Sequence, residues 1–412
     1  MPELPRDLNL PLDGVKVLDL SRLLPGPFCS LLLADLGAEV LKVEDTGMGD
    51  YVRWTPPYMG DEDAKERGVA SAQFAALNRN KRSIQIDLKH ESGKEILLKL
   101  VAQHDVVLES FRPGVLDKLG VGYETMKTVN SALVYCAITG YGQDGSFRHR
   151  AGHDMNYLGL GGLLALTGAK GGPPVQAAGQ IADIGGGAQM AAIAILAALV
   201  KKRATGAGAN LDVSMTDGAL SWLAMPAASA LAGDVRHRGD VDLAGRWVCY
   251  MPYEAADGWV SCGALEPKFW RSFCEGVGRE DLIAKQFELA GSEGWTEIAE
   301  VFKSKTRTEW AAFNDERDCC IEPILEIDEA LDSELVRERE MVMTIDQPGV
   351  GAMRQVAPPI VIDGQRPDRS EPAPAFGEHT DDVLAELGYD SEEVAVLRAS
   401  GAVKGVDTGA HA

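Results

Sequence analysis

Alternating strand and helix patterns in the first 140 residues constrain the fold of this chain most strongly. Short apolar runs typical of buried β-strands recur, and helical segments separate them. Helices are expected over 27–37, where Gly37 ends the helix, and over 91–103. This alternation predicts βαβ units, and therefore an α/β fold with a mainly parallel sheet. The expected strands are VKVLDL (15–20), EVLKVE (39–44), SIQIDL (83–88), DVVLES (105–110) and ALVYCAITGYG (132–142).

The pattern changes in the second half of the chain. A helix from Asp183 to about Arg203 should end at the glycines of TGAGA, and LDVSM (211–215) is a further expected strand. YMPYEAADGWVSCGA (250–264) predicts a β-hairpin that turns at Asp257-Gly258, and helical stretches follow it. We therefore expect two domains: a large one formed by 1–224 and 336–412, and a smaller α+β one over 225–335.

Two segments have little regular pattern. Residues 46–70 are polar and punctuated by Gly and Pro, so we expect a long surface loop there, and such loops are often functional. Residues 348–374 are rich in proline and should be extended. A helix over 379–387 should then return the chain to the large domain.

Charge and cysteine content exclude several classes of protein. The chain has 40 Lys+Arg against 62 Asp+Glu, so its net charge is 40 − 62 = −22. Such a field repels polyanions, which argues against a nucleic-acid or anionic-membrane partner. The seven cysteines are odd in number and show no CxxC spacing, so we expect reduced thiols in a cytoplasmic protein with no structural metal site.

Membrane and export signals are weak. The start MPELPRDLNLPLDG lacks a basic region followed by an apolar one, so no secretory signal is expected. The uncharged runs 184–200 and 218–233 are shorter than the roughly 20 residues that a membrane span needs. We expect both to be buried helices.

Common cofactor and nucleophile motifs are absent from the sequence. The first strand is followed by LSRLLPGP, which lacks the G-x-G-x-x-G that brings a dinucleotide to a helix N-terminus. The chain contains no G-x-x-x-x-G-K-[ST], no G-x-S-x-G and no H-E-x-x-H. A nicotinamide, flavin or metal cofactor is therefore not expected.

Basic residues gather at two expected strand boundaries of this acidic chain. Arg79, Lys81 and Arg82 stand immediately before a strand, and Arg112 and Lys118 follow another. A solvated charged turn is one interpretation of such a run. The alternative is a local phosphate-binding site, because guanidinium and ammonium groups bind phosphate oxygens well.

Three further residues carry groups suited to proton transfer. Asp183 precedes three glycines at a helix start, and it is either an N-cap or a carboxylate beside free N–H groups that could stabilise an oxyanion. His153 is either a structural histidine or an acid/base group. Glu266 is followed by Pro267, as at the start of a helix. Spacing alone does not bring the three together.

Several segments in order resemble the class III CoA-transferase family, which includes the carnitine and bile-acid CoA-transferases. The resemblance covers nearly the whole chain. It implies a Rossmann-like large domain, a smaller domain, and an interlocked homodimer in which each chain threads through a ring formed by the other. The segments are LDGVKVLDLSRLLPGPFCSLLLADLGAEVLKVE, NRNKRSIQIDLK, FRPGVLDKLG, ITGYGQDG and GEHTDDVLAELGY.

Two chemistries share this family scaffold. Transferases use an aspartate at the position of Asp183 as a nucleophile, whereas alpha-methylacyl-CoA racemases use it as an acid/base and add a histidine in G-H-D and a glutamate in A-[IL]-E-P. The chain has Gly152-His153-Asp154 and Ala264-Leu265-Glu266-Pro267. The resemblance therefore favours the racemase branch, with a CoA-transferase as the alternative.

The resemblance also implies roles for these residues. His153 and Asp183 would exchange protons on opposite faces of the alpha carbon of an acyl-CoA, and Glu266 would orient His153. N–H groups at the start of the Asp183 helix would meet the enolate oxygen. CoA would be part of the substrate, with no further cofactor. The CoA-facing residues would include Asn78, Arg79, Lys81, Arg82, Phe111, Arg112, Val115 and Lys118.

Overall fold

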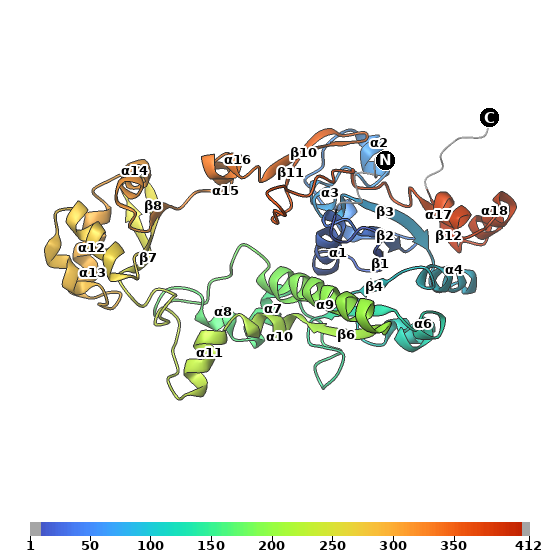
Figure 1. Cartoon of the computed structure of the whole chain (residues 1–412), viewed down its shortest axis with the longest axis horizontal. Helices are drawn as coiled ribbons and strands as arrows, with labels where there is room; N and C mark the ends of the chain where they lie inside the picture. The colour runs from blue at the N-terminus through green and yellow to red at the C-terminus, as the bar shows by residue number, and fades with distance from the viewer. Residues whose placement is uncertain (1–9, 406–412) are drawn as a thin grey trace. The chain divides into compact units, whose positions relative to one another are not determined.

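The computed structural model describes residues 10–405, and these form two compact units (Figure 1). The larger unit comprises the described parts of 1–158, 180–221 and 337–412, and the smaller one comprises 159–179 and 222–336. The boundaries expected near 225 and 336 lie within a few residues of the observed boundaries at 222 and 336. Residues 159–179, expected in the large domain, belong to the smaller unit.

A seven-stranded sheet forms the core of the larger unit. Its order is β12-β3-β2-β1-β4-β5-β6, and all neighbouring strands are parallel except the short antiparallel edge strand β12. This confirms the α/β prediction and all six expected strands. The strands are β1 (Lys16–Asp19), β2 (Glu39–Glu44), β3 (Lys81–Ile86), β4 (Val106–Glu109), β5 (Val134–Thr139), β6 (Ala209–Ser214) and β12 (Val403–Lys404).

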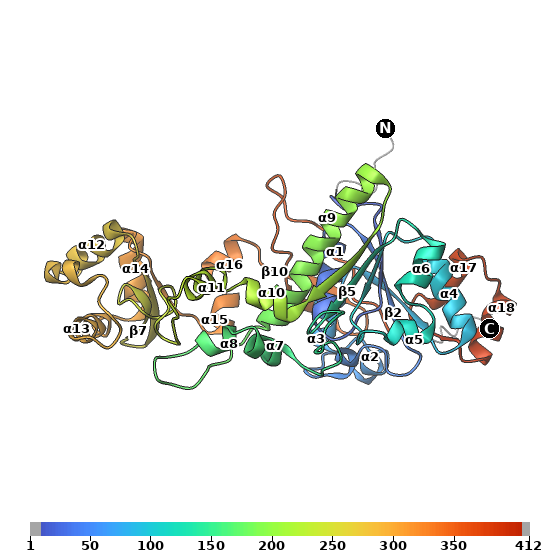
Figure 2. The ribbon, with the colours of Figure 1, turned by 90° about the horizontal axis from the view of Figure 1, so that it is seen from below.

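Helices cover both faces of this sheet, as parallel strands require. On one face lie α1 (Pro25–Asp35) and α9 (Met190–Thr205), which contact β1, β2, β5 and β6. On the other face lie α4 (Glu91–Val101), α6 (Tyr123–Val129) and α17 (Thr380–Glu386), whose apolar side chains join those of the strands in one buried cluster. Figure 2 shows the strands between these two groups of helices. The sheet is therefore buried on both sides.

Residues 46–70 lie largely at the surface, as the composition predicts, but they are not irregular throughout. They contain η2 (Tyr51–Trp54) and α2 (Glu62–Glu66), and the segment is held by the buried side chain of Arg53. The Arg53 guanidinium donates to both carboxylate oxygens of Glu44 at 2.9 and 2.6 Å, and to the carbonyl oxygens of Gly68 and Pro374. One arginine inside a polar stretch thus orders the stretch, which composition alone does not reveal.

The proline-rich tail is largely extended, as predicted. Its first residues form the turn and the second strand of an antiparallel hairpin of β10 (Val342–Gln347) and β11 (Gly351–Val356), which the composition does not reveal. The helix expected over 379–387 is α17, and the His379 N–H donates to the Ser83 carbonyl on β3 at 2.9 Å. The return of the chain to the large domain is therefore confirmed.

The smaller unit has its own core and a three-stranded antiparallel sheet of β7 (Tyr250–Ala255), β8 (Gly258–Gly263) and β9 (Ile321–Pro323). The β7–β8 hairpin is present as predicted, but it turns at Ala256-Asp257, one residue before the predicted Asp257-Gly258, and Gly258 begins β8. The core is aromatic: the rings of Phe273 and Phe302 stack at 5.1 Å, and Trp310 packs against both. The helices that supply them are α12 (Pro267–Gly276), α13 (Glu293–Phe302) and α14 (Arg307–Arg317).

The segment Ile181–Thr205 is long and apolar enough to cross a membrane by length and composition. It comprises a π-helical start, η3 (Ile181–Gln189), and α9. Half of its most apolar window is buried inside the protein, and α9 packs on β5, β6 and α1. It is the core helix that the sequence predicts, and Gly206 ends it with φ = +73°.

Glycines in η3 allow very close backbone contact with α10 (Met215–Ser221). A Cβ atom added to Gly218 would lie 2.1 Å from the carbonyl oxygen of Gly186, and one added to Gly186 would lie 2.7 Å from that of Met215. Neither position tolerates a side chain unless the two helices move apart. The glycines that follow Asp183 thus serve helix packing.

We predict that Gly218→Ala destabilises the protein by about 1–3 kcal/mol, because the added methyl group must displace backbone of η3. Thermal and denaturant unfolding measure the change. Gly159→Ala is the matched control, since no atom lies within 4 Å of a Cβ added at Gly159. Equal stability of the two variants would contradict the packing role.

Candidate functional site

The strand order places a crevice at one point of the sheet. Strands β1, β2 and β3 follow one another in one direction, and β4, β5 and β6 continue from β1 in the other. The loops that leave the carboxyl ends of β1 and β4 therefore diverge. Ligands of open α/β sheets bind at such a switch point, so Ser21–Leu24 and Ser110–Pro113 are expected beside the site.

A cavity of about 470 Å³ opens beside this switch point, and we call it the Asp183 cavity. Its wall comes from the loops after β1, β4 and β5, from the start of α7 (Asp154–Leu160), and from η3. Both His153 and Asp183 line it, so the fold brings together two of the three predicted proton-transfer groups. The charged and polar lining side chains are those of Arg22, Ser110, Arg112, Thr139, Arg148, Arg150, His153, Asn156, Tyr157 and Asp183.

Asp154, the last residue of the G-H-D motif, positions Asp183. The buried Asp154 carboxylate accepts hydrogen bonds from the backbone N–H groups of Ala182, at 2.7 Å, and Asp183, at 3.0 Å. Asp154 is the first residue of α7, directly after His153. The carboxylate therefore ties the helix that follows His153 to the helical turn that carries Asp183.

The same arrangement changes the acidity of Asp183. The pKa of Asp183 is raised from an ordinary 3.8 to about 6: burial is the largest cause, the Asp154 carboxylate adds to it, and His153 opposes both. A carboxyl group of this acidity exists in both protonation states near neutral pH. It can therefore take up or release a proton, as a general acid or base must.

His153 is exposed at the cavity wall, and its backbone is fixed by α7. Its N–H donates to the Asn156 side chain at 3.0 Å, and its carbonyl accepts from the N–H groups of Asn156 and Tyr157. The Tyr157 hydroxyl donates to the Gly152 carbonyl at 2.5 Å. Burial, with the nearby Asp183 carboxylate, raises the pKa of that hydroxyl to about 12, so it stays protonated.

The expected oxyanion role of the Asp183 helix start is wrong for this structure. The N–H groups of Ala182 and Asp183 are bonded to Asp154, and that of Ile184 donates to the Gln180 carbonyl at 2.9 Å. The helix also begins at Ile181, so Asp183 is not its N-cap. These donors are consumed by the fold and do not face an enolate.

Glu266 lies in the smaller unit, at the N-cap position of α12. Pro267 occupies the first turn, as predicted, and the Glu266 side chain makes no capping hydrogen bond. The carboxylate is exposed. Its role beside His153 stays a prediction.

The first predicted CoA-binding group, Asn78, Arg79 and Lys81, lies inside the larger unit. Arg79 donates to both oxygens of the Asp35 carboxylate at 3.1 and 2.7 Å. The buried Lys81 ammonium donates to the Pro27 carbonyl and to the Asn78 side chain. Their charges and donors are used by internal partners, which gives these three residues a structural function in the described chain.

The remaining predicted CoA-binding residues lie in three different places. The Arg82 guanidinium donates to both oxygens of Glu386, away from the Asp183 cavity. Phe111 and Arg112 line that cavity. Val115 and Lys118 lie on the short helix α5 (Val115–Leu119) that follows them.

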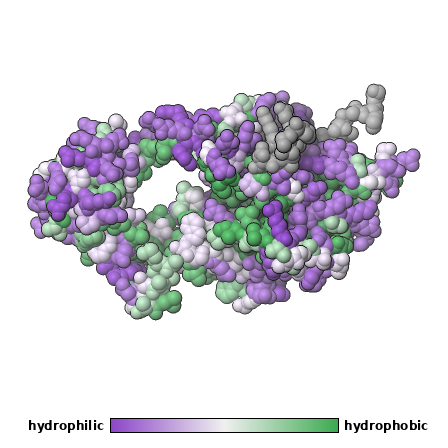
Figure 3. Space-filling view, in the orientation of Figure 1, coloured by the Kyte–Doolittle hydropathy of each residue, from purple (hydrophilic) through white to green (hydrophobic). Residues whose placement is uncertain are grey.

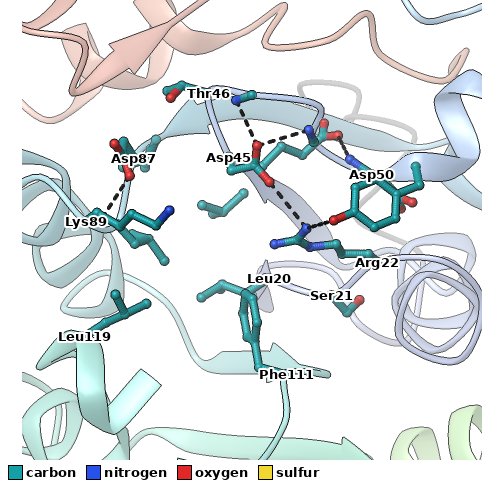
Figure 4. A pocket seen from close by; sticks show the side chains of 17 residues that line it. Leu20, Ser21, Arg22, Asp45, Thr46, Asp50, Asp87, Lys89, Phe111 and Leu119 are labelled. Carbon is teal, nitrogen blue, oxygen red and sulfur yellow. Dashed lines mark hydrogen bonds and ion pairs between the residues drawn. The ribbon is translucent and has the colours of Figure 1, made fainter. Parts of the chain in front are cut away.

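A second cavity, of about 500 Å³, lies at the carboxyl ends of β1, β2 and β3, and we call it the strand-end cavity. Figure 4 shows Leu20 and Phe111 on one side of it, Asp45 and Thr46 on another, and Asp87 and Lys89 on a third. Of these residues, only Phe111 is predicted from the sequence to bind a ligand. The end of each predicted strand was the signal that could have identified the others.

Within residues 10–405, no group of three or more His, Cys, Asp or Glu side chains is arranged to hold a metal ion. All seven cysteines are unpaired. The chemical groups gathered at the Asp183 cavity are a histidine, a carboxyl of raised pKa and several arginines. Such a set suits proton transfer on an anionic substrate.

The model of CoA-transferase family III matches residues 12–380. This chain belongs to that family. Human alpha-methylacyl-CoA racemase is 33% identical over 93% of this chain and 95% of its own length. Human succinyl-CoA:glutarate CoA-transferase is 32% identical over 95% of this chain and 90% of its own length. A CAIB/BAIF family protein from Brucella suis has a similar solved structure, with a TM-score of 0.77, 33% identity, and coverage of 92% of this chain and 100% of that one.

These comparisons establish a family III enzyme and leave two reaction types among its relatives. Racemase and transferase relatives match about equally well, so identity does not separate the reactions. The arrangement of groups at the Asp183 cavity is the feature that can favour one of the two reactions.

We predict that Asp154→Asn lowers the pKa of Asp183, because the amide oxygen still accepts the two N–H groups while the negative charge is lost. The acidic limb of the pH profile of kcat/KM for an acyl-CoA should move to lower pH. Glu124→Gln makes the same charge change on the exposed side of α6 and should leave that limb in place. An unmoved limb in Asp154→Asn would show that Asp154 does not set the acidity of Asp183.

Proposed function

We propose that this protein is a racemase or epimerase that inverts the alpha carbon of 2-methyl-branched acyl-CoA thioesters. The observation that carries the proposal is that His153 and Asp183 line one cavity and that the pKa of Asp183 is raised to about 6. Inversion requires removal of the alpha proton from one face and delivery of a proton to the other. Two independent acid/base groups at one cavity meet this requirement.

The reaction balances with the residues of the chain alone. One group takes the alpha proton, the electrons of the C–H bond move into the thioester to give an enolate, and the other group returns a proton to the opposite face. No electrons are gained or lost, so no redox cofactor is needed. Because the helical N–H groups are occupied, we assign stabilisation of the enolate to the positive field of Arg148 and Arg150 on the cavity wall.

We further propose that the active form is the interlocked homodimer implied by the family resemblance, in which Glu266 reaches His153 across the subunit interface and stabilises its protonated form. The smaller unit exposes an apolar helix that supports assembly: on α11 (Ala224–Leu231), Met225 is 67% and Leu231 is 90% exposed. Figure 3 shows hydrophobic surface where α11 lies in Figure 1. The seven free cysteines are consistent with a cytoplasmic enzyme.

A family III CoA-transferase is the second candidate. The names of several relatives support it, including two succinyl-CoA:glutarate CoA-transferases. In that reaction the Asp183 carboxylate would attack the thioester carbonyl, forming an acyl anhydride and releasing CoA thiolate. The thiolate would then attack the aspartyl carbonyl, which releases the donor acid and leaves an aspartyl-CoA thioester. A second carboxylate would attack this thioester, and the released CoA thiolate would take the acceptor acyl group and return Asp183 as a carboxylate. Asp183 is partly exposed in the cavity, so attack is sterically feasible.

Deuterium exchange separates the two reactions. With a single enantiomer of a 2-methylacyl-CoA in D2O and no acceptor acid, we predict that the wild-type protein incorporates deuterium at the alpha carbon and racemises the substrate. His153→Ala should slow racemisation by about 10²–10⁴-fold, because one face loses its acid/base group. Mass spectrometry and chiral chromatography measure the two quantities.

A transferase would give the opposite pattern. Deuterium would not enter the alpha carbon, CoA would move to an added carboxylic acid, and Asp183→Ala would abolish this transfer while His153→Ala retained much of it. That result with several branched acyl-CoAs would overturn the proposed racemase.

Binding of the CoA moiety is predicted to depend on the cavity arginines. Arg112→Ala should weaken binding of CoA roughly 3- to 10-fold, since one charge-assisted contact to a phosphate is lost near solvent. Arg82→Ala removes an equal charge that is paired with Glu386 and should leave the affinity unchanged. Titration calorimetry measures the two CoA affinities. Equal affinities of the two variants for CoA would contradict a contact between Arg112 and CoA.

A further inference from the structure

The two cavities of the larger unit share two side chains, Arg22 and Phe111. Arg22 follows β1 and Phe111 follows β4, so the pair stands at the switch point of the sheet. The Arg22 guanidinium lies 5.5 Å from the centre of the Phe111 ring. Together they form a partition between the strand-end cavity and the Asp183 cavity.

Arg22 is held in this partition by a carboxylate and a phenol. Its Nη1 atom lies 3.4 Å from Oδ2 of Asp45 and donates to the Tyr51 hydroxyl at 3.2 Å. Figure 4 shows the Arg22 side chain directed toward Asp45 with Phe111 below it. The ion pair is accessible to solvent, because 31% of the Arg22 side chain and 40% of the Asp45 side chain are exposed. A soluble anion can therefore reach Arg22.

Asp45 does not need Arg22 to keep its place. Its Oδ1 atom accepts the N–H groups of Gly47, at 2.8 Å, and Gly49, at 3.3 Å, so the turn after β2 fixes the carboxylate. Its other oxygen, Oδ2, faces the guanidinium. Release of Arg22 would leave this turn intact and the cation free to bind another anion.

Two carboxylates of the strand-end cavity are paired with cations other than Arg22. The Glu44 carboxylate is bound by Arg53, and Asp50 forms a buried ion pair with Lys42 at 2.9 Å. Lys89 is the second cation on the wall. Of the two cations that line this cavity, only Arg22 also borders the Asp183 cavity.

We propose that Arg22 exchanges its partner when substrate binds: Asp45 neutralises it in the free protein, and the diphosphate of the acyl-CoA replaces Asp45 in the complex. This inference rests on the proposed function. If the thioester lies beside Asp183, and the nucleotide fills the strand-end cavity, the link between them must cross the partition. In CoA the diphosphate is the anionic group that joins the nucleotide to the pantetheine arm, and a guanidinium binds its oxygens through two donors.

The exchange predicts that Asp45 opposes binding. Asp45→Asn should tighten CoA binding roughly 2- to 5-fold, since a competing surface ion pair is removed while the amide oxygen still accepts the turn N–H groups. Arg22→Gln should weaken CoA binding about tenfold. In the double variant, Asp45→Asn should bring no gain, because its effect acts through Arg22. Titration calorimetry at fixed ionic strength measures all four affinities.

Two controls define the source of the effect. Glu39→Gln makes the same charge change in an exposed ion pair with Lys16, at the opposite ends of β1 and β2, and should leave CoA affinity unchanged. The gain from Asp45→Asn should persist with 3′-dephospho-CoA, which keeps the diphosphate, and disappear with pantetheine, which has no phosphate.

The possible failures are distinguishable. Absence of CoA binding to the wild-type protein would overturn the proposed function together with this inference. If the wild-type protein binds CoA, any of four results would overturn the inference alone. The first two are no gain in CoA affinity from Asp45→Asn, and an equal gain when Arg22 is also replaced. The other two are an equal gain in Glu39→Gln, and a gain that disappears with 3′-dephospho-CoA.

Discussion

The Asp154 carboxylate is the interaction on which the candidate site depends. By accepting the N–H groups of Ala182 and Asp183, it joins two segments that are 28 and 29 residues apart in the chain. His153, immediately before Asp154, is thereby brought to the same cavity as Asp183. The negative charge that fixes the geometry also raises the pKa of Asp183. Asp154 thus contributes to both the position and the acidity of Asp183, and burial makes the larger contribution to the acidity.

Glycine packing complements this bond. Gly186 and Gly218 let η3, which carries Asp183, and α10 approach until their backbones touch. Of the glycines after Asp183, Gly186 and Gly187 face Met215 at the start of α10. The anion-binding capacity of the site resides instead in arginines from the loops after β1, β4 and β5.

The sequence was sufficient to predict the strands of the parallel sheet, because most of them are buried and rich in apolar residues. It also singled out His153, Asp183 and Arg112, which line one cavity. It failed where long-range partners decide the role of a charge. Arg79 and Lys81 looked like phosphate ligands, yet Asp35 and Pro27 take up their donors. Arg53 orders a polar segment through Glu44, and no local pattern shows this pairing.

Arg22 is the opposite case: it is a residue whose proposed role the sequence did not suggest. It lies in LSRLLPGP, which lacks the glycine motif of dinucleotide-binding turns, so nothing in the sequence predicts a ligand at this turn. Only the strand order shows that this turn lies opposite the loop of Phe111. A residue at a switch point acquires its function from topology, which a single sequence does not display.

A structure determined with a bound 2-methylacyl-CoA would test the central claim most directly. The account predicts that the alpha carbon lies between the His153 imidazole and the Asp183 carboxyl, with a reactive atom of each about 3–3.5 Å away on opposite faces. A complex in which Asp183 faces the thioester carbonyl carbon, with the alpha carbon out of reach of His153, would contradict it.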